Sequence, residues 1–475
     1  MNHTFLWHDY ETFGIHPAKD RPAQFAAIRT DSALNEIGAP IMHYCQQTPD
    51  YLPSAGACLV TGITPQQCNE QGLPEYQFAE HIQAAFSEPG TIGTGYNTLR
   101  FDDEFTRHLF WRNLIDPYAR EWQNQCSRWD LLDVVRTTFA LRPEGITWPE
   151  HEDGKPSFRL EHLTAANQIA HQGAHDALVD VRATIALARL IQKTAPRLFD
   201  FCLALRHKAK VLEEIGGVGA QGRPLLHISG MFDASKGCLA IVFPLAQHPN
   251  NKNEIIAWNL AEDPRILASL DADQIRSQIF VRQDELPEGQ TRLPIKTIHI
   301  NKSPIVIQNL KTLRPESAEK WGIHLETALK HAAYAQALPD LTPLWAQVYN
   351  RPAFEANDAE YDLYGGFVNT SDRRALTHWL TQDFNTRIQT IPLLEDARLN
   401  TLLARYRARY APEQLSELEL EEWQNHCQAR LIQGEHGART AQALFDEIDT
   451  LNETATEAQV EVLSALYDYA ESIIP

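Results

Sequence analysis

Two carboxylates that stand one residue apart near the start of the chain constrain its fold most strongly. Asp9 and Glu11 lie in the stretch FLWHDYETFG, residues 5–14, which begins like a buried β-strand. In a strand, residues i and i+2 point to the same face, so both acids would share a face with Phe5 and Trp7. Two anions held this close raise each other's pKa unless a positive charge lies between them. The stretch therefore either forms a strand that binds a cation or does not form a strand.

The length and composition of the chain are those of a globular protein with several domains. A chain of 475 residues exceeds what one hydrophobic core organises, and ordinary domain sizes predict about three domains. The N-terminus has no basic start followed by an apolar run, and no apolar stretch reaches the roughly 18 residues that a membrane span needs. Seven scattered cysteines without a C-x-x-C pair predict reduced thiols. We therefore expect a cytoplasmic protein that is neither secreted nor inserted in a membrane.

The net charge of −20 argues at first against a nucleic-acid ligand, because binding to phosphates depends on Lys and Arg. The charge is unevenly distributed, however. Residues 411–475 hold 14 Asp and Glu against two Arg, so this segment alone carries −12 and the preceding 410 residues only −8. A locally basic surface that binds phosphates is compatible with this distribution.

The first of three segments, residues 1–193, mixes strands and helices. Short apolar runs at 5–11, 23–31 and 39–46 are β-like, and we expect them to form consecutive antiparallel strands. Apolar residues recur at helical spacing near 129–141 and again before residue 193. This pattern predicts an α/β domain.

The remaining two segments differ from the first and from each other. Residues 194–348 contain strand-like runs between 224 and 308 with one helical insert near 271–280, which fits a small β-barrel domain. Residues 349–475 contain several amphipathic helical stretches, which predict a helical C-terminal domain.

Two further acidic patterns follow the opening pair. In NTLRFDDE, residues 97–104, Asp102 follows a phenylalanine, and in AHDALVD His175 lies five residues before Asp180. Each pattern is weak by itself, because a single His or Asp at a helix start is more often a cap or a solvated residue. In this order on one α/β segment, the three patterns together form a strong signature.

This combination resembles the 3'-5' exonucleases with three acidic motifs and a histidine of the form H-x-x-x-x-D, the DEDDh superfamily. The match is carried by Asp9 and Glu11 in DYE, Asp102 in NTLRFD, and His175 with Asp180 in HDALVD. The stretches RPAQFAAIRTD, SRWDLLD and SFRLEHLT further resemble the bacterial exodeoxyribonuclease I family across essentially the whole chain. The resemblance implies a ribonuclease-H-like exonuclease domain followed by an SH3-like β-barrel and an α-helical C-terminal domain, in agreement with the three segments.

The resemblance also implies a metal site. Asp9, Glu11, Asp102 and Asp180 would bind two Mg²⁺ ions, for which Mn²⁺ can substitute, because hard carboxylate oxygens favour these ions over Zn²⁺. The ions would neutralise the clustered acids, which answers the question that the opening stretch raises.

His175 is the expected general base, since an unperturbed histidine pKa near 6.5 lets the ring accept a proton around neutral pH. Asp103, next to Asp102, and Asp176, next to His175, are expected to be solvated or capping residues outside the site.

Cations and aromatic rings alternate between residues 107 and 159, as in proteins that hold a single strand. Unpaired bases stack on rings for about 1–3 kcal/mol each, and arginines contact phosphates. The interleaved residues are Arg107, Tyr118, Trp122, Arg128, Trp129, Arg136, Arg142, Trp148, Phe158 and Arg159. Some of these rings are equally well core residues, Trp129 above all. We predict as substrate contacts Glu11, Arg107, Tyr118, Trp122, Arg136, Arg142, Phe158, Arg159 and, in the barrel segment, Lys302; by resemblance, Phe158 and Arg159 touch the 3' end.

One apparent motif is rejected. GVGAQG, residues 217–222, fits G-x-G-x-x-G but follows a helix-like stretch and precedes a strand, the reverse of what a dinucleotide fold needs. We expect a loop there, and the sequence has no G-K-[ST] phosphate loop that would indicate ATP.

We therefore interpret the chain as a Mg²⁺-dependent, processive exonuclease that removes 5'-mononucleotides from the 3' end of single-stranded DNA, acts in DNA repair and is monomeric. The family resemblance also implies contact with the acidic tail of bacterial single-stranded DNA-binding protein. Two alternatives stay open on sequence alone. One is a 3'-5' exoribonuclease on the same site, since 2'-OH contacts cannot be recognised from residues. The other is a catalytically silent strand-binding scaffold, against which the intact acidic set argues.

Overall fold

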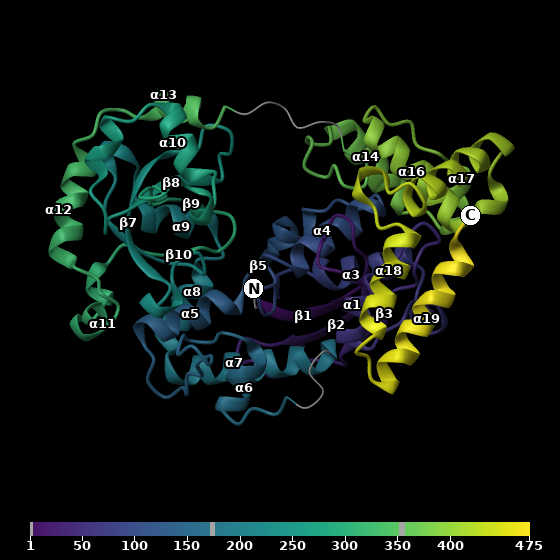
Figure 1. Ribbon diagram of the computed structural model, residues 1–475, viewed down its shortest axis with the longest axis horizontal. Coiled ribbons are helices and arrows are strands. Elements are labelled where there is room, and N and C mark those ends of the chain that lie inside the picture. Colours follow the sequence, from purple (N-terminus) through teal and green to yellow (C-terminus); the bar gives the residue numbers. More distant parts are fainter. Residues whose placement is uncertain (1–2, 172–175, 351–356) are drawn as a thin grey trace. The chain divides into compact units, whose positions relative to one another are not determined.

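The computed structural model describes residues 3–171, 176–350 and 357–475 (Figure 1). Its elements group by contact into two compact units, and each is described by itself. Unit 1 comprises Met1–Ser127, His171–Arg182 and Phe354–Pro475, and unit 2 comprises Arg128–Ala170 and Ala183–Ala353. Because these units are defined by contacts, they do not test the predicted domain boundaries after residues 193 and 348, which stay predictions.

The N-terminal sheet has the strand order β3-β2-β1-β4-β5. The strands are β1 (Thr4–Thr12), β2 (Pro22–Thr30), β3 (Ile41–Tyr44), β4 (Thr91–Thr94) and β5 (Ser127–Arg128). β1 is antiparallel to β2 and parallel to β4, and β2 is antiparallel to β3. The prediction of three consecutive antiparallel strands at the start of the chain is confirmed.

β1 is largely buried on both faces, and its apolar side chains pack on each of them. On one face Leu6 and Tyr10 pack into a hydrophobic cluster with residues of α3 (Glu75–Ser87) and α4 (Asp102–Arg112). On the other face Trp7 is fully buried. Because side chains alternate along a strand, Asp9 and Glu11 follow on the face of Trp7. β1 therefore delivers two carboxylates from the middle of a rigid sheet.

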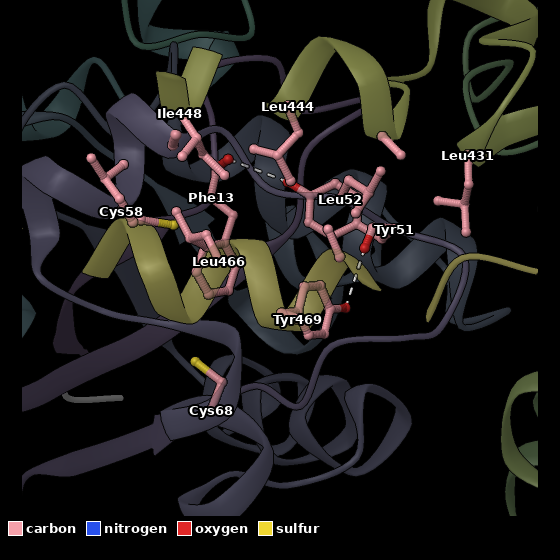
Figure 2. Packing of buried hydrophobic residues seen from close by; sticks show 14 of the residues in the cluster. Phe13, Tyr51, Leu52, Cys58, Cys68, Leu431, Leu444, Ile448, Leu466 and Tyr469 are labelled. Atoms are coloured by element: carbon pink, nitrogen blue, oxygen red, sulfur yellow. Dashed lines mark hydrogen bonds between the residues drawn. The ribbon is translucent and has the colours of Figure 1, made fainter. Parts of the chain in front are cut away.

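The C-terminal helices of unit 1 share a core with its N-terminal part (Figure 2). Three of them, α17 (Glu417–Leu431), α18 (Ala441–Asn452) and α19 (Glu457–Ile473), contribute to the cluster in Figure 2. The other three, α14 (Thr370–Leu380), α15 (Phe384–Gln389) and α16 (Ala397–Tyr410), pack in a second cluster with residues of α3 and α4. Leu444 and Leu466 pack with Phe13, and the hydroxyl of Tyr469 donates to the carbonyl of Tyr51 at 3.2 Å. Two short helices after β3, α1 (Ala55–Thr61) and α2 (Pro65–Gln71), lie in the same cluster through Cys58 and Cys68.

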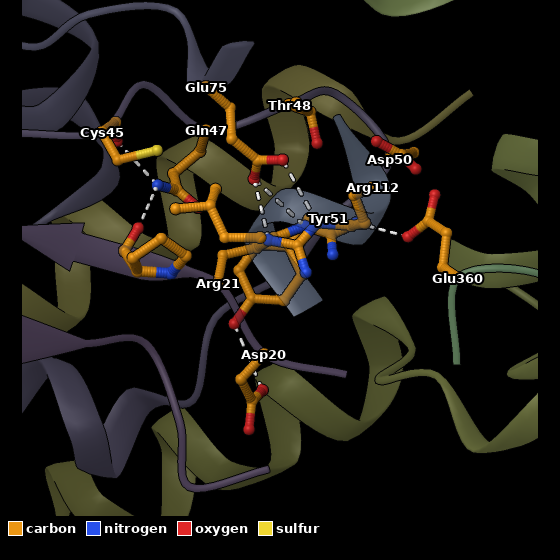
Figure 3. A network of polar contacts seen from close by, with 12 residues as sticks. Asp20, Arg21, Cys45, Gln47, Thr48, Asp50, Tyr51, Glu75, Arg112 and Glu360 are labelled. Carbon is orange, nitrogen blue, oxygen red and sulfur yellow. Dashed lines mark hydrogen bonds and ion pairs between the residues drawn. The ribbon is translucent and has the colours of Figure 1, made fainter. Parts of the chain in front are cut away.

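A buried network of ion pairs joins the same two parts of unit 1 (Figure 3). Nη2 of Arg21 lies 2.8 Å from Oε2 of Glu360, and Nη1 of Arg430 lies 3.0 Å from the same oxygen. Arg21 also approaches Glu75, which pairs with Arg112 at 3.1 Å. Burial alone would raise the pKa of Glu360, but the surrounding arginines hold it well below its usual range. The charged group is therefore a fixed part of the core.

Unit 2 contains an antiparallel sheet of order β10-β6-β7-β8-β9. Its strands are β6 (Leu225–Ile228), β7 (Leu239–Gln247), β8 (Glu254–Asn259), β9 (Ile295–His299) and β10 (Ile305–Ile307). Between β8 and β9 lies α10 (Ala272–Ile279), which Asp271 and Gln274 begin with a reciprocal capping box. The predicted strand-rich segment with one helical insert is confirmed.

Unit 2 also contains α-helices outside the sheet region. They are α5 (Leu131–Leu141), α6 (Leu160–Ala166), α8 (Pro196–Ala204), α9 (Lys208–Ile215), α11 (Pro315–Lys320), α12 (Leu325–Gln336) and α13 (Thr342–Val348), while α7 (Ala177–Thr194) contributes residues to both units. The stretch 217–222 lies between α9 and β6 and contains a 3-10 turn at Gly219–Gln221, so the glycine-rich segment connects a helix to a strand and not a strand to a helix, as predicted.

All seven cysteines are buried and free, as the scattered spacing predicts. Within the described ranges, the structure has no helix that combines the length and the apolar character needed to cross a membrane.

Candidate active site

Three carboxylates from two elements meet at one point. Asp9 and Glu11 come from β1, and Asp180 comes from the first turn of α7. One oxygen of each lies within 4.8 Å of the others. The strand alternation that predicts a shared face for Asp9 and Glu11 is thus confirmed, and the third acid, some 170 positions along the chain, is added by the fold.

Two of the three acids, Asp9 and Glu11, have strongly raised pKa values. Burial raises the pKa of Asp9 well above its usual range, and the charges of Asp102 and Asp180 raise it further. Burial, Asp9 and Asp180 together raise the pKa of Glu11 to about 9. Among the described residues, no lysine or arginine forms an ion pair with Asp9, Glu11 or Asp180. A divalent cation would stabilise a group of adjacent carboxylates in which the raised pKa values of Asp9 and Glu11 oppose ionisation.

Asp102 stands beside this trio at the start of α4. Its side chain is buried, and Oδ1 accepts the backbone N–H of Tyr10 at 3.1 Å. Tyr10 lies between Asp9 and Glu11 on β1, so this hydrogen bond fixes Asp102 against the acidic end of the strand. Asp102 acts on the pKa of Asp9 but is not one of the three residues whose oxygens meet.

The predicted base, His175, lies outside the described residues. Its neighbour Asp176 is exposed and accepts the backbone N–H of Leu178 at 3.0 Å and of Val179 at 3.3 Å. The prediction that Asp176 caps the helix is confirmed.

The prediction that Asp103 is solvated or caps a helix is wrong. Asp103 is 1% exposed, and its Oδ1 lies 2.5 Å from Nη2 of Arg120 and 4.0 Å from Nε2 of His8. Burial lowers the pKa of His8 to about 4, so Arg120 supplies the charge opposite Asp103. Consecutive helical residues point about 100° apart, and Asp102 and Asp103 therefore face different surroundings.

A histidine that the sequence analysis missed contacts the site. Nε2 of His171 lies 2.5 Å from Oδ1 of Asp180, and the His171 side chain is 7% exposed. The signal was present in the sequence as a second histidine, four residues before His175, but the H-x-x-x-x-D spacing drew attention to His175 alone.

The residues of unit 1 that are predicted to contact the single-stranded substrate differ from one another in burial and partners. Arg107 is buried, and its guanidinium pairs with Glu121 at 2.8 Å and with Glu104 at 2.9 Å while lying over the ring of Tyr118. Its charge is balanced by two carboxylates, a structural role that the prediction did not include. Tyr118 is half-buried, whereas the Trp122 side chain is 63% exposed. Trp122 thus has the ring surface that stacking requires.

The residues of unit 2 that are predicted to contact the substrate also differ in their partners and exposure. Arg136 pairs with Asp133 at 2.6 Å, and Arg142 donates to the carbonyl of Thr312 at 3.1 Å. Lys302 is half-buried.

Phe158 is half-buried with its ring edge against Phe139, while the adjacent Arg159 side chain is 66% exposed. Trp129, the residue with the strongest claim to the core, is buried, and its Nε1 donates to the carbonyl of Cys202 at 3.1 Å. Arg128 is buried as well. Of the interleaved set in unit 2, Arg159 presents the most accessible cation.

A second group that resembles a metal site is an ion-pair network instead. Asp50, Glu360 and His426 are close enough together to hold a cation. However, Arg409 forms ion pairs with both carboxylates, and Arg430 lies 3.0 Å from Glu360. Because guanidinium groups already occupy these oxygens, the cluster is structural.

Comparison with known proteins gives three family matches along the chain. The family described as Exonuclease matches residues 6–188, the Exonuclease I SH3-like domain matches residues 206–351, and the Exonuclease I C-terminal domain matches residues 357–473. The predicted fold class is confirmed: a ribonuclease-H-like exonuclease domain is followed by an SH3-like domain and a helical C-terminal domain.

Individual relatives match over essentially the full length. The exodeoxyribonuclease I of Escherichia coli is 44% identical over 479 aligned positions, which cover 99% of this chain and 98% of the relative. The solved structure of exonuclease I from Methylocaldum szegediense is similar with a TM-score of 0.94 at 42% identity, covering 100% of both chains. A zinc-bound structure of E. coli exonuclease I in complex with single-stranded DNA has a TM-score of 0.93 at 43% identity and the same coverage. The chain therefore belongs to the exodeoxyribonuclease I family.

Proposed function

We propose that the chain is a divalent-metal-dependent exonuclease that removes 5'-mononucleotides from the 3' end of single-stranded DNA. The observation that carries the proposal is the meeting of Asp9, Glu11 and Asp180 within 4.8 Å in a chain that belongs to an exonuclease family. Single-stranded DNA as the substrate is supported by the E. coli exonuclease I complex with that ligand. The domain boundaries 1–193, 194–348 and 349–475 are part of the proposal.

The residues present fit a divalent cation. Their donors are carboxylate oxygens, which suit Mg²⁺ and Mn²⁺, and the pKa of Glu11 is raised to about 9, which a bound cation would reverse. We assign Asp9, Glu11, Asp102 and Asp180 as ligands of two Mg²⁺ ions, with Mn²⁺ able to substitute. When bound, the ions supply Lewis-acid activation of water and stabilise negative charge on the phosphate and the leaving oxygen.

The chain's own residues supply the proton transfer and the binding of the strand. His175 accepts the proton of the attacking water. Exposed groups hold the last nucleotides, with Trp122 offering a ring for stacking and Arg159, next to Phe158, offering a cation to a phosphate. Glu11, Arg107, Tyr118, Arg136, Arg142 and Lys302 complete the proposed set of substrate contacts.

The cellular side of the proposal follows from the family. We propose that the protein is a cytoplasmic monomer that acts processively in DNA repair and contacts the acidic tail of single-stranded DNA-binding protein. Sedimentation of the purified chain tests the monomer. Processivity is tested by adding an excess of unlabelled strand after the reaction starts, because this trap captures every enzyme that dissociates. The number of nucleotides removed before capture should decrease as rising salt weakens the phosphate contacts.

Degradation of end-labelled oligonucleotides tests the central proposal. A 5'-labelled single strand of DNA with Mg²⁺ should shorten in single-nucleotide steps with release of 5'-mononucleotides, and EDTA should stop the reaction. The matched control is Asp9→Ala, which should bind the strand without degrading it.

The same assay separates the alternatives. Faster degradation of an RNA strand of the same sequence would make the protein an exoribonuclease. Strand binding without metal-dependent release of nucleotides from either polymer would make it a binding scaffold.

A further inference from the structure

His171 makes the one side-chain hydrogen bond to Asp180 found among the described residues. Its Nε2 lies 2.5 Å from Oδ1 of Asp180, nine residues further along the chain. The two side chains are 7% and 20% exposed. When the Asp180 carboxylate is ionised it only accepts hydrogen bonds, so Nε2 of His171 is then the donor. A nearly buried imidazole thus holds one of the two oxygens of a residue of the carboxylate trio.

The backbone around Asp180 is fixed by other groups. Asp176 caps α7, and Oε1 of Gln24, from the strand paired with β1, accepts the backbone N–H of Ala177 at 3.4 Å. These contacts place the first turn of the helix beside Glu11, which is opposite Gln24 in the sheet. They leave the torsion angles of the Asp180 side chain undetermined, and His171 is the group that restrains them.

We propose that His171 is a positioning residue for Asp180, which orients this carboxylate toward Asp9 and Glu11 for a divalent cation. The inference rests on the proposed function of the site. The carboxylates of the trio repel one another: after burial, which is the largest cause, the charge of Asp180 is among those that raise the pKa values of Asp9 and Glu11. Without a restraint, Asp180, whose side chain is 20% exposed, would turn toward solvent, and metal binding would have to restore its orientation.

Asp180 is the member of the trio to which this argument applies. Glu11 is 7% exposed and is held with Asp9 by the ladder of β1, whereas Asp180 projects from the end of a helix. Groups that orient metal ligands from the second layer typically contribute about 10- to 100-fold to metal affinity. His171 should therefore affect the affinity for the cation and leave the affinity for the strand unchanged.

Mn²⁺ titration of the full-length protein without DNA, followed by calorimetry or by electron paramagnetic resonance, tests the inference. His171→Ala should weaken Mn²⁺ binding about 10- to 100-fold. His171→Gln, whose amide can donate from about the position of Nε2, should recover most of the affinity. The matched control is His331→Ala, which removes a half-buried histidine whose ring bonds the carbonyl of Leu260 at 2.9 Å and should leave Mn²⁺ binding unchanged.

Kinetics give a second readout that a purely structural role would not move. With His171→Ala the rate should fall at limiting Mg²⁺ and return toward the wild-type rate at saturating Mg²⁺, with KM for DNA unchanged. Unaltered or tighter Mn²⁺ binding by folded His171→Ala would overturn the inference, as would a loss that His171→Gln does not repair. If Asp180→Ala also binds Mn²⁺ like the wild type, the proposed metal site itself fails, so the two failures are distinguishable.

Discussion

Arg120 and Asp103 form a buried ion pair, with 2.5 Å between Nη2 and Oδ1, immediately next to the proposed metal ligand Asp102. Asp102 accepts a hydrogen bond from the strand that carries Asp9 and Glu11. Two adjacent acids at the start of α4 thus have separate tasks. One contributes charge to the site, and the other fixes the helix to the segment that contains Arg120.

Substitution should separate these two tasks. Asp103→Ala leaves the Arg120 charge buried without its partner, and loss of one member of a buried pair costs about 3–5 kcal/mol of folding stability. Asp102→Asn keeps an oxygen that can accept the Tyr10 N–H but removes the charge, so it should abolish nuclease activity with little loss of stability. Urea unfolding and nucleotide release measured on both variants check this. Equal stability losses in the two would contradict the assignment.

Asp9→Ala and Asp180→Ala should each abolish hydrolysis while leaving strand binding largely intact, because they remove metal ligands and not stacking surfaces. Removing one of three mutually repelling acids should also stabilise the metal-free protein. Activity assays, strand-binding titrations and melting temperatures in EDTA measure the three effects. Near-normal turnover by either folded variant would remove that residue from the site.

His175→Ala should lower kcat by roughly 10²- to 10⁴-fold, the range expected for loss of a general base, with little change in metal affinity. The wild-type rate should fall toward acidic pH as the base becomes protonated. The decisive comparison is the pH–rate profile of the variant. If it keeps the wild-type rate and the same fall in acid, His175 is not the base.

The raised pKa of Glu11 predicts how stability of the metal-free protein depends on pH. Burial, Asp9 and Asp180 raise this pKa from 4.5 to about 9. Between these values the folded protein retains a proton that the unfolded chain has released, so the contribution of Glu11 to stability decreases as pH rises through this range. Bound Mg²⁺ or Mn²⁺ favours the ionised form and should oppose the decrease.

Melting temperatures in EDTA across this range, for the wild type and Glu11→Gln, measure the effect. The amide that replaces the carboxyl group in this variant does not titrate, so the difference between the two proteins should grow with pH. A constant difference between the two melting temperatures across the range would show that Glu11 is ionised in the metal-free fold.

The sequence could predict those features that depend on residues only a few positions apart. Alternation along β1 places Asp9 and Glu11 on one face, and helix capping signals place Asp176, because both depend on residues a few positions apart. Burial and pairing across the chain were not accessible in this way. Asp103 resembles a solvated acid until Arg120 is folded against it, and the run of alternating cations and rings does not reveal that Arg107 pairs with Glu104 and Glu121.

Family resemblance supplied the assignment of Asp180 and Asp102, which periodicity could not. It did not supply His171, because the motif contains one histidine, whereas the ten residues before Asp180 contain two, His171 and His175. The division of the sequence into three consecutive segments also did not indicate that the C-terminal helices pack on the N-terminal part of the chain. An amphipathic pattern shows that a helix has an apolar face but not which element covers that face.

That shared packing makes the helical C-terminal region part of the fold of the catalytic region. Phe13 and Tyr51 lie in one cluster with Leu444, Leu466 and Tyr469. The charges depend on each other too, because Glu360 pairs with Arg21 and with three arginines of the C-terminal helices. Glu360→Ala should therefore cost at least about 3–5 kcal/mol of unfolding free energy, since it leaves buried arginines without their partner. Glu413→Ala, at an exposed position of the same region, is the control and should be nearly neutral.

A chain that ends after Gln192 should consequently fail to fold as a cooperative unit, although it contains every proposed catalytic residue. It would expose the apolar surface of Phe13 and Tyr51 and leave Arg21 with Glu75 alone. Circular dichroism during heating should show a broad transition, the dye ANS should bind to exposed apolar surface, and oligonucleotides should not be degraded. A sharp melting transition together with metal-dependent cleavage of short strands by this fragment would show instead that the N-terminal region folds alone, and that residues beyond 192 serve only to hold the strand.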